Sequence, residues 1–439
     1  MLDKQKIDEL FTRGVGEFID PDGIFRKKLE NNPEKIIIKF GVDPTRPDIH
    51  LGHAVVLRKL RQFQDLGCKI VFLIGDYTAQ IGDPTGKSKE RPEISVNEIN
   101  SNAETYLKQV GSILDVSNKN KYELLKNSIW YQSPTDYLGG TMTQKAISWE
   151  KDRSDYIAIR GELPTTTLWN FMYVLRHVTH AQIIERDMFQ KRIKSGEQLF
   201  MHELMYPILQ GIDSHIIAGF FHSCDLEVGG TDQTFNMLMG RNVMKVNKQE
   251  PQAVLAFKIL EGLDGKEKMS KSLDNYVGIT DEPNDMYGKI MSIPDSSIVN
   301  YFELCTFTSM DEIEEISQKL DKNSINPKDI KMELAKQIVE IYHGKEKATQ
   351  AENSFIKTFQ KGEIPEEMVD IVIEQGETLM LGSVKNAIVS SNSEFRRLVE
   401  EGAITNLENG EKITDTNFIP NNETKFRIGK KRFVKILVK

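Results

Sequence analysis

One turn, between a short apolar run and an amphipathic segment, constrains most strongly how this chain can fold. The run before it, residues 35–40, is rich in β-branched side chains and predicts a buried strand. The segment after it, residues 54–63, carries apolar side chains at helical spacing. The turn itself spans Gly41 to His53 and reads GVDPTRPDIHLGH. A strand that passes directly into a helix opens a parallel α/β sheet, and ligands bind such sheets where the strands end.

This turn has the residue types of an anion-binding site. Backbone N–H groups and the positive end of the helix dipole favour a phosphate at the start of a helix. Gly41 and Gly52 allow a ligand to approach the backbone closely. His50 and His53 project from one face of the first helical turn, and Thr45 supplies a hydroxyl. Two alternatives fit the same residues: a His-x-x-His metal site, which lacks a third ligand at a suitable spacing, or a helix cap with surface histidines.

A second stretch, residues 265–272, reads GKEKMSKS and brings lysines close to hydroxyl side chains. Lys268 and Lys271 could neutralise a polyphosphate, although an ordinary solvated basic loop has the same composition. Together, the strings HLGH and KMSKS resemble the two signatures of the class I aminoacyl-tRNA synthetases. Residues 206–213 and 228–236, between them, are similar to the amino-acid helix and the ribose-side loop of the tyrosyl-tRNA synthetase family. Four motifs in this order make the resemblance specific, and it extends from about residue 35 to the C-terminus.

The resemblance implies a two-step reaction with ATP, L-tyrosine and tRNA(Tyr) as substrates. The tyrosine carboxylate attacks the α-phosphate of ATP to give tyrosyl-adenylate and pyrophosphate, and the tyrosyl group then moves to the terminal adenosine of the tRNA. Catalysis then rests on positioning and on stabilising the leaving pyrophosphate. Mg²⁺ is expected to accompany ATP, without a dedicated metal site in the protein. The implied catalytic residues are Thr45, His50, His53, Lys268 and Lys271. The implied ATP-binding residues are Gly41, Gly52, Asp232, Gln233 and Lys271.

A polar stripe on an expected buried helix gives a second indication of the substrate. Residues 202–215 are expected to be helical, and Tyr206, Gln210 and Asp213 share one face of that helix. Their apolar neighbours indicate burial, and buried polar groups need partners. A ligand with an ammonium at one end and a phenol at the other would satisfy them. The resemblance assigns the phenol to Asp213, and the implied tyrosine-binding set is Asp43, Asp83, Tyr206, Gln210 and Asp213.

Two positions beside this set depart from a common family pattern. Many bacterial relatives carry a tyrosine, as a second phenol contact, where this chain has Lys39. A ribose-contacting cysteine of some relatives is replaced by Phe40. The chain is closer to a bacterial subgroup that also lacks these two residues, so no second partner of the phenol is assigned.

Other functions share parts of the pattern. Tryptophanyl-tRNA synthetases have the same fold and both signatures, but the Asp213 face argues against them. A non-catalytic RNA-binding paralogue would not need the catalytic set that is intact here. A small-molecule nucleotidylyltransferase has a similar histidine motif, but the KMSKS loop disfavours it. Residues 82–88 imitate a P-loop but place three residues, instead of four, between the glycines.

Charge and cysteine content limit the environment of the protein. The net charge of −8 argues against a uniformly basic surface for nucleic acid. The three cysteines include no C-x-x-C motif, so they predict neither a disulfide framework nor a zinc site and suit a reducing compartment. A signal-peptide core and an apolar run of membrane-spanning length are both missing from the sequence. We therefore expect a cytoplasmic protein without membrane contact, and the resemblance alone implies a homodimer.

The C-terminal stretch differs from the rest in charge. Residues 384–439 carry 11 Lys and Arg against 7 Asp and Glu, a net charge of +4, which leaves −12 on the remainder. The segments 393–399, 402–404 and 426–433 resemble an S4-type RNA-binding domain. The expected phosphate-contacting patch is Arg396, Arg397, Lys430, Lys431 and Arg432. A small basic module that makes no RNA contact is the alternative.

The length of 439 residues exceeds what one compact core accommodates. We expect an α/β fold with a Rossmann-like parallel-sheet catalytic domain, followed by a helical domain and a small α+β S4-like domain. The expected segments are an N-terminal helical segment (1–34), the catalytic domain (35–260) with an insertion near 133–167, the lysine loop (261–279), a helical domain on the anticodon side (280–361), a linker (362–380) and the S4-like domain (381–439).

Overall fold

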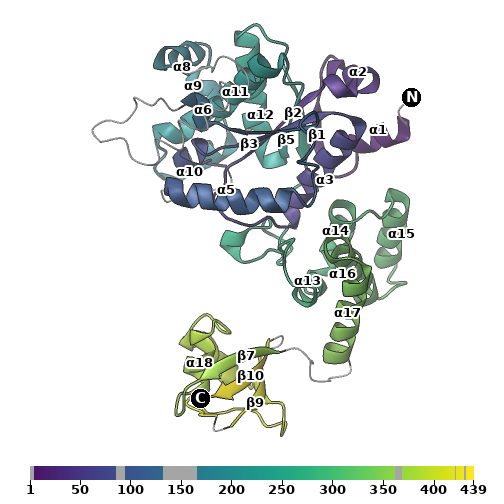
Figure 1. The fold of residues 1–439 in the computed structure, drawn as a ribbon, viewed down its shortest axis with the longest axis vertical. Coiled ribbons are helices and arrows are strands. Elements are labelled where there is room, and N and C mark those ends of the chain that lie inside the picture. The colour runs from purple at the N-terminus through teal and green to yellow at the C-terminus, as the bar shows by residue number, and fades with distance from the viewer. Residues whose placement is uncertain (1–3, 86–93, 132–165, 361–367, 421, 430–431) are drawn as a thin grey trace. The chain divides into compact units, whose positions relative to one another are not determined.

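The structure is a computed structural model that describes residues 4–85, 94–131, 166–360, 368–420, 422–429 and 432–439 (Figure 1). The chain divides into two units, Met1–Gly344 and Lys345–Lys439. Most of the insertion expected near residues 133–167 lies outside the described residues, as do Lys430 and Lys431 of the expected RNA-binding patch. None of the helices in the described ranges is both long enough and apolar enough to cross a membrane.

The first unit is built around a six-stranded sheet with the strand order β1-β6-β5-β2-β3-β4. β1 (Val15–Ile19) runs antiparallel to β6 at one edge. The parallel strands are β2 (Ile37–Val42), β3 (Lys69–Ile74), β4 (Tyr122–Lys126), β5 (Leu226–Gly230) and β6 (Ala253–Phe257). The chain lays down β2, β3 and β4 in one direction and then returns to the other side of β2 with β5 and β6. The carboxyl ends of β2 and β5 therefore form the switch point at which open α/β sheets bind ligands.

Helices cover both faces of this sheet. α3 and α5 lie on one side, and α11 and α12 lie on the other (Figure 1). The strand order advances in one direction from β2 to β4 and in the opposite direction from β5 to β6. Right-handed crossovers therefore place the helices of these two halves on opposite faces of the sheet. The four covering helices are α3 (Leu51–Leu66), α5 (Val96–Val110), α11 (Met201–Phe221) and α12 (Thr234–Val246). The shorter ones are α1 (Lys4–Leu10), α2 (Ile24–Asn31), α4 (Thr78–Ile81), α6 (Ser128–Tyr131), α8 (Leu168–Leu175), α9 (His180–Ile184) and α10 (Asp187–Ser195).

A group of helices follows the sheet. Within the first unit these are α13 (Pro283–Met291), α14 (Ile298–Cys305), α15 (Met310–Asp321) and α16 (Pro327–His343), and α17 (Lys345–Phe355) opens the second unit. Tyr287 and Tyr301 are fully buried here, and the Tyr301 hydroxyl donates to the carbonyl of Glu261 (2.8 Å). That hydrogen bond joins α14 to the start of the lysine loop.

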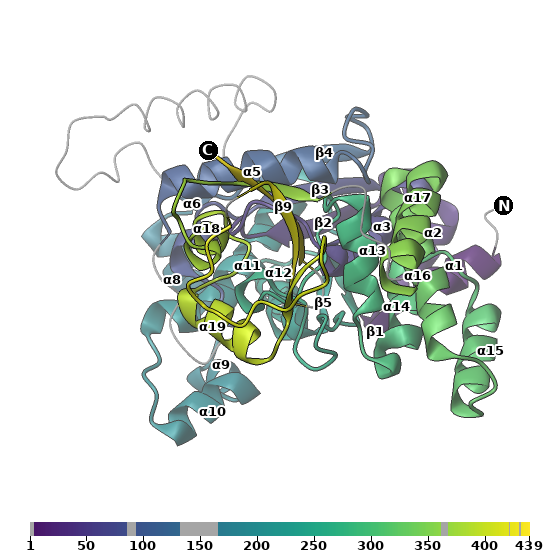
Figure 2. The same ribbon diagram turned by 90° about the horizontal axis from the view of Figure 1, so that it is seen from below.

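The second unit contains a four-stranded sheet with the order β7-β10-β9-β8. Its helices α18 (Leu379–Lys385) and α19 (Asn392–Glu400) lie beside the strands (Figure 2). Phe395, Phe426, Val434 and Ile436 are buried in its core. The strands are β7 (Val369–Ile373), β8 (Ile404–Asn406), β9 (Thr424–Ile428) and β10 (Arg432–Val438).

The expected fold class is confirmed, but two segment assignments are wrong in part. The N-terminal segment 1–34, expected to be helical, contributes β1 to the sheet through pairing with β6. The segment 362–380, expected to be a linker, contains β7 and the start of α18. β7 pairs in parallel with β10, so the small module begins by Val369 and not at residue 381. Both strands owe their conformation to a partner that is distant in sequence, which a local pattern does not reveal.

Candidate active site

The loop between β2 and α3 lies at the switch point, and η2 (Thr231–Gln233), a 3₁₀ turn, follows the neighbouring parallel strand β5. Backbone hydrogen bonds attach this loop to the end of the lysine loop. The amide of Leu51 donates to the carbonyl of Val277 (2.9 Å), and the amide of Ile279 donates to the carbonyl of Ile49 (3.1 Å). The fold therefore brings together the two motifs that are far apart in the sequence.

The two glycines of the first motif flank this loop, Gly41 in β2 and Gly52 in α3, and Thr45 lies within it. A side chain at Gly41 would meet nothing within 4 Å, so the backbone there is open to a ligand. A Cβ at Gly52 would lie 3.1 Å from the His50 ring, so glycine is needed to leave that ring in place. Thr45 is half-buried in the same loop, and its amide donates to the carbonyl of Asp43 (2.8 Å).

The two histidines of the motif are stacked and neutral. Their ring centroids are 3.8 Å apart, and the backbone amide of His50 donates to Nδ1 of His53 (3.4 Å). Burial lowers the pKa of His50 to about 2, with His53, Lys271 and Lys268 acting in the same direction, and lowers the pKa of His53 to about 4. Nδ1 of His50 is buried and has no hydrogen-bond partner among the described residues. Nδ1 of His50 is therefore a ring nitrogen that can bond a ligand.

The lysines of the second motif are paired with carboxylates. Lys268 Nζ lies 3.0 Å from Asp232 Oδ2, and Lys271 forms an ion pair with Asp48. Lys271 also lies 5.3 Å from the centroid of the Tyr276 ring. Asp232, which the resemblance assigns to the ribose, therefore already has a cationic partner.

Tyr206 joins the stripe on α11 to the first motif. It is buried, and its hydroxyl donates to Asp43 Oδ2 (2.8 Å). The second oxygen of Asp43 accepts from Thr78 Oγ1 (2.8 Å). Asp43, which the resemblance places among the tyrosine-binding residues, thus orients the side chains of Tyr206 and Thr78 just after the end of β2.

Asp213 lies one helical turn beyond Gln210 on the same stripe and is 3% exposed. Its two oxygens accept from Trp130 Nε1 (2.9 Å) and Asn127 Nδ2 (3.3 Å). Burial raises the pKa of Asp213 to about 6, although the charge of Lys39 opposes the shift. Each carboxylate oxygen has a second lone pair, so Asp213 can still accept from a ligand hydroxyl.

Lys39, noted above as a departure from a common family pattern, belongs to a buried ion pair. Its Nζ lies 2.9 Å from Glu227 Oε1, and both side chains are 1% exposed. Lys39 also donates to the carbonyl of Gln210 and to Ser214 Oγ, both at 2.8 Å. Gln210 Nε2 donates to Glu227 Oε1 (3.0 Å), which makes the amide oxygen of Gln210 the end that can accept from an ammonium. The sequence signal for this pair was a charge inside an apolar strand, which requires a buried partner.

Asp83 bonds to neighbours on two different segments of the chain. Its Oδ1 accepts from the amide and the hydroxyl of Thr85 (3.0 and 2.6 Å), and its Oδ2 accepts from Gln233 Nε2 (2.7 Å). Asp83 and Gln233, which the resemblance assigns to different substrates, are therefore direct neighbours. The described part of the chain holds no cluster of three or more His, Cys, Asp or Glu side chains suited to a metal ion.

Comparison with known proteins identifies the family. Residues 31–360 match the family model described as tRNA synthetases class I (W and Y). The chain belongs to this family. It is 41% identical to "Tyrosine--tRNA ligase" of Francisella tularensis over 98% of both chains. It is 42% identical to "Tyrosine--tRNA ligase 2" of Clostridium acetobutylicum over 99% of this chain and 100% of the relative.

Solved structures of class I synthetases share the fold. A C-terminally truncated mitochondrial tyrosyl-tRNA synthetase from Aspergillus nidulans gives a TM-score of 0.59 at 21% identity, covering 81% of this chain and 94% of that one. Plasmodium falciparum tryptophanyl-tRNA synthetase gives 0.53 at 15% identity, covering 80% and 88%. The fold alone therefore does not separate a tyrosine enzyme from a tryptophan enzyme.

In the second unit of this class I synthetase, the structure describes three residues of the expected RNA-binding patch. Arg396 and Arg397 are exposed on α19, and Arg397 Nε lies 3.7 Å from Glu401. Arg432 at the start of β10 forms an ion pair with Glu394 (2.8 Å). Arg396 and Arg397 therefore offer cationic groups on one short helix, whereas Arg432 is partly neutralised.

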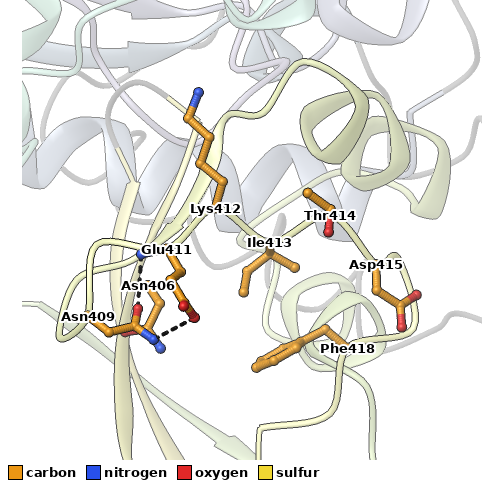
Figure 3. A pocket seen from close by; sticks show the side chains of 8 residues that line it. All are labelled: Asn406, Asn409, Glu411, Lys412, Ile413, Thr414, Asp415 and Phe418. Atoms are coloured by element: carbon orange, nitrogen blue, oxygen red, sulfur yellow. Dashed lines mark hydrogen bonds between the residues drawn. The ribbon is translucent and has the colours of Figure 1, made fainter.

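The same unit contains a pocket with polar and apolar lining residues (Figure 3). Ile413 and Phe418 supply its apolar part, and Asn409 Nδ2 donates to Glu411 Oε2 (2.9 Å) at its polar rim. None of the described arginines of the patch lines this pocket. It contributes no residue to the site at the switch point.

Proposed function

We propose that the chain is a tyrosine–tRNA ligase, which activates L-tyrosine with ATP and transfers the tyrosyl group to the 3′ end of tRNA(Tyr). The observation that carries the proposal is the buried carboxylate of Asp213 on the α11 stripe, at a position suited to a phenol. Full-length relatives that bear the name tyrosine–tRNA ligase support it. A carboxylate accepts from an indole N–H as well as from a phenol, as Asp213 does from Trp130 Nε1 (2.9 Å). Asp213 therefore calls for a donor at this end of the substrate, and the names of the relatives favour tyrosine over tryptophan.

In the proposed complex, Asp213 accepts from the substrate hydroxyl. Tyr206, Gln210 and Asp83 hold the ammonium, and Asp43 orients Tyr206. In tyrosyl-tRNA synthetases as a class, a site that bonds the hydroxyl rejects phenylalanine by about 10⁵-fold, a known value for these enzymes that sets our expectation. Polar groups that would be left unpaired by phenylalanine are the physical reason.

The nucleotide binds along the β2–α3 loop in this proposal. Gly41 and Gly52 admit the phosphates close to the backbone, while Asp232 and Gln233 take the ribose. Thr45, His50 and His53 donate to the phosphates as neutral groups, and Lys268 and Lys271 neutralise the departing pyrophosphate. Mg²⁺ arrives with ATP and supplies further charge neutralisation, keeping mostly water and phosphate ligands.

The decisive experiment is amino-acid-dependent exchange of pyrophosphate into ATP, with tyrosine, phenylalanine and tryptophan in parallel. We expect exchange with tyrosine alone. Exchange with tryptophan would retain the fold and the chemistry but overturn the assignment of Asp213. A folded sample that exchanges with none of the three and still binds tRNA would instead be a non-catalytic paralogue.

We also propose that the protein is a cytoplasmic homodimer. Its three cysteines are buried free thiols, which suits a reducing compartment. Leu168 and Trp169, adjacent on α8, and Met201 on α11 are large apolar side chains that are 77%, 72% and 69% exposed, and a second copy of the chain would cover them in this proposal. The mass measured by light scattering should be twice that of the chain. Trp169→Asp should shift the protein toward the monomer, and a monomeric wild type would contradict the proposal.

A further inference from the structure

Arg186 reaches from the segment between α9 and α10 into the switch-point site. Its Nη2 donates to Thr85 Oγ1 (2.6 Å) and to the carbonyl oxygen of Asp232 (3.4 Å). Thr85 in turn donates to Asp83. One guanidinium therefore spans the amino-acid side of the site, at Asp83, and the nucleotide side, at Asp232.

Aromatic rings hold this guanidinium in place. Its central carbon lies 5.2 Å from the centroid of the Phe235 ring and 5.6 Å from that of Phe189. Contacts of this kind fix a planar cation without consuming its N–H groups. The two rings and the two hydrogen bonds of Nη2 thus fix the position of the side chain, while other N–H groups of the guanidinium stay available to a ligand.

Within the described part of the chain, one nitrogen of the Arg186 guanidinium is left without a hydrogen bond. Its Nη1 is buried and has no hydrogen-bond partner among the described residues. Burial lowers the pKa of Arg186, and the charges of Asp83 and Asp232 act against that shift. A buried guanidinium nitrogen without an acceptor is unfavourable, so an anionic ligand would complete the site.

The chemistry of tyrosyl-adenylate identifies the anion. Its atoms run from the ammonium through the carboxyl group and the α-phosphate to the ribose. If Asp83 binds the ammonium and Asp232 the ribose, the group between them is the carboxyl–phosphate linkage. We propose that Arg186 is a catalytic residue of the activation step, donating to the tyrosine carboxylate and to the α-phosphate of ATP. This inference rests on the proposed function.

The role of Arg186 is electrostatic and involves no proton transfer. A carboxylate oxygen forms a bond to the α-phosphorus while the bond from that phosphorus to the oxygen bridging to the β-phosphate breaks. Pyrophosphate leaves with the electron pair of that bond, and Arg186 stays protonated throughout. Its cation opposes the repulsion between two anions that must approach, and stabilises charge on the α-phosphate oxygens.

The test measures single-turnover formation of tyrosyl-adenylate by Arg186→Ala, with tyrosine affinity measured separately at equilibrium. We expect the rate to fall by about 10²–10³-fold, the usual effect of removing one such donor, with tyrosine affinity changed only a few-fold. Guanidinium chloride, far below unfolding concentrations, should restore part of the rate, whereas methylammonium chloride should not. Arg176→Ala, an exposed arginine at the end of α8, is the matched control and should react like the wild type.

The following results would overturn the inference. Wild-type adenylate formation by Arg186→Ala would exclude a catalytic role. A loss that guanidinium does not rescue, with lowered thermal stability, would make Arg186 a structural link between Thr85 and Asp232. Normal adenylate formation with slow transfer to tRNA would place it against the acceptor end. If the wild type itself shows no exchange with tyrosine, the proposed function fails first, and this inference fails with it.

Discussion

Lys39 places a charge in β2 between the buried side chains of Ile38 and Phe40. The pair with Glu227 satisfies that charge, and the same Glu227 holds the amide of Gln210. Removing one partner of such a pair leaves a buried, uncompensated charge, whereas removing both leaves a neutral site. The pair thus holds Gln210, a residue of the proposed tyrosine-binding set, in place.

Lys39→Met should lower the free energy of unfolding by about 3–5 kcal/mol, because Glu227 would remain buried without its cation. Adding Glu227→Gln should recover much of that loss. Urea denaturation of the two single variants and the double variant measures the coupling. Lys69→Met is the control, since Lys69 on the neighbouring strand pairs with the partly exposed Glu123 and should cost less than about 1 kcal/mol. Equal losses in the two lysine variants would contradict the role of the pair.

Asp213 should give the stability of the protein a recognisable pH dependence. Burial raises its pKa from an ordinary 3.8 to about 6, so the folded state holds its proton more tightly than the unfolded state. The stabilisation from this group is complete below pH 3.8 and is lost as the pH rises through about 6. Asp213→Asn should remove this component, so the difference in unfolding free energy between wild type and variant should change over that window. A constant difference between the two proteins across that window would show that Asp213 titrates normally.

At the scale of elements, α14 ends against two arginines from earlier parts of the chain. Arg13 donates to the carbonyls of Glu303 (3.0 Å) and Thr308 (2.7 Å), with further bonds to neighbouring carbonyls of the same turn. Arg58 on α3 donates to the carbonyl of Cys305 (2.7 Å). The last carbonyls of a helix lack partners within it and carry negative dipole charge, so these cations suit the position. They also attach the helices after the lysine loop to the sheet.

Arg13→Met should therefore destabilise the first unit by about 1.5–3 kcal/mol, the range for hydrogen bonds to charged groups. Its effect should appear in urea denaturation of the whole chain. Arg61→Met on the exposed face of α3, where Arg61 pairs with Asp65 at 2.8 Å, should change stability by less than about 1 kcal/mol. If Arg13→Met lowers the free energy of unfolding no more than Arg61→Met does, water hydrogen-bonds the last carbonyls of α14 equally well and Arg13 is not needed for stability.

Elements with a strong local pattern could be predicted from the sequence. The strand expected at 35–40 is β2 (Ile37–Val42), and the helix expected at 202–215 lies within α11 (Met201–Phe221). β1 and β7 could not be predicted, because each depends on a strand far along the chain. Pairing energy, rather than local propensity, decides the conformation of such short segments.

The same division holds for the site. The two signature motifs and the α11 stripe were recognisable because their residues are neighbours in sequence. The sequence did not single out Glu227, Asp48 or Arg186 as site residues, because each contributes through a contact with a residue on another segment of the chain. Lys39 was noticed as a departure from a pattern, but only packing shows which carboxylate it meets. Side-chain networks between distant segments are what the sequence leaves undetermined.

At the scale of the whole molecule, the chemistry and the expected RNA contact belong to different units. The residues of the switch-point site lie in the first unit, and the described arginines of the patch lie in the second. In the proposed function, activation of tyrosine involves no RNA, whereas charging would use the expected RNA-binding patch of the second unit as well. Substitutions in the patch should therefore separate the two half-reactions, which substitutions at the switch point cannot do.

The double variant Arg396→Ala/Arg397→Ala should weaken tRNA charging while leaving pyrophosphate exchange at the wild-type rate. Each cation lost from a phosphate contact should reduce the slope of log tRNA affinity against log salt concentration by about 1. The loss of two arginines should therefore reduce this slope by about 1–2. Lys385→Ala is the matched control, because this lysine of α18 belongs to the same unit but lies 3.5 Å from Glu374. An unchanged salt slope in the double variant would exclude α19 from the RNA interface. An equal fall in pyrophosphate exchange would mean that the substitutions disturb the first unit, because the exchange assay contains no tRNA whose binding could be weakened.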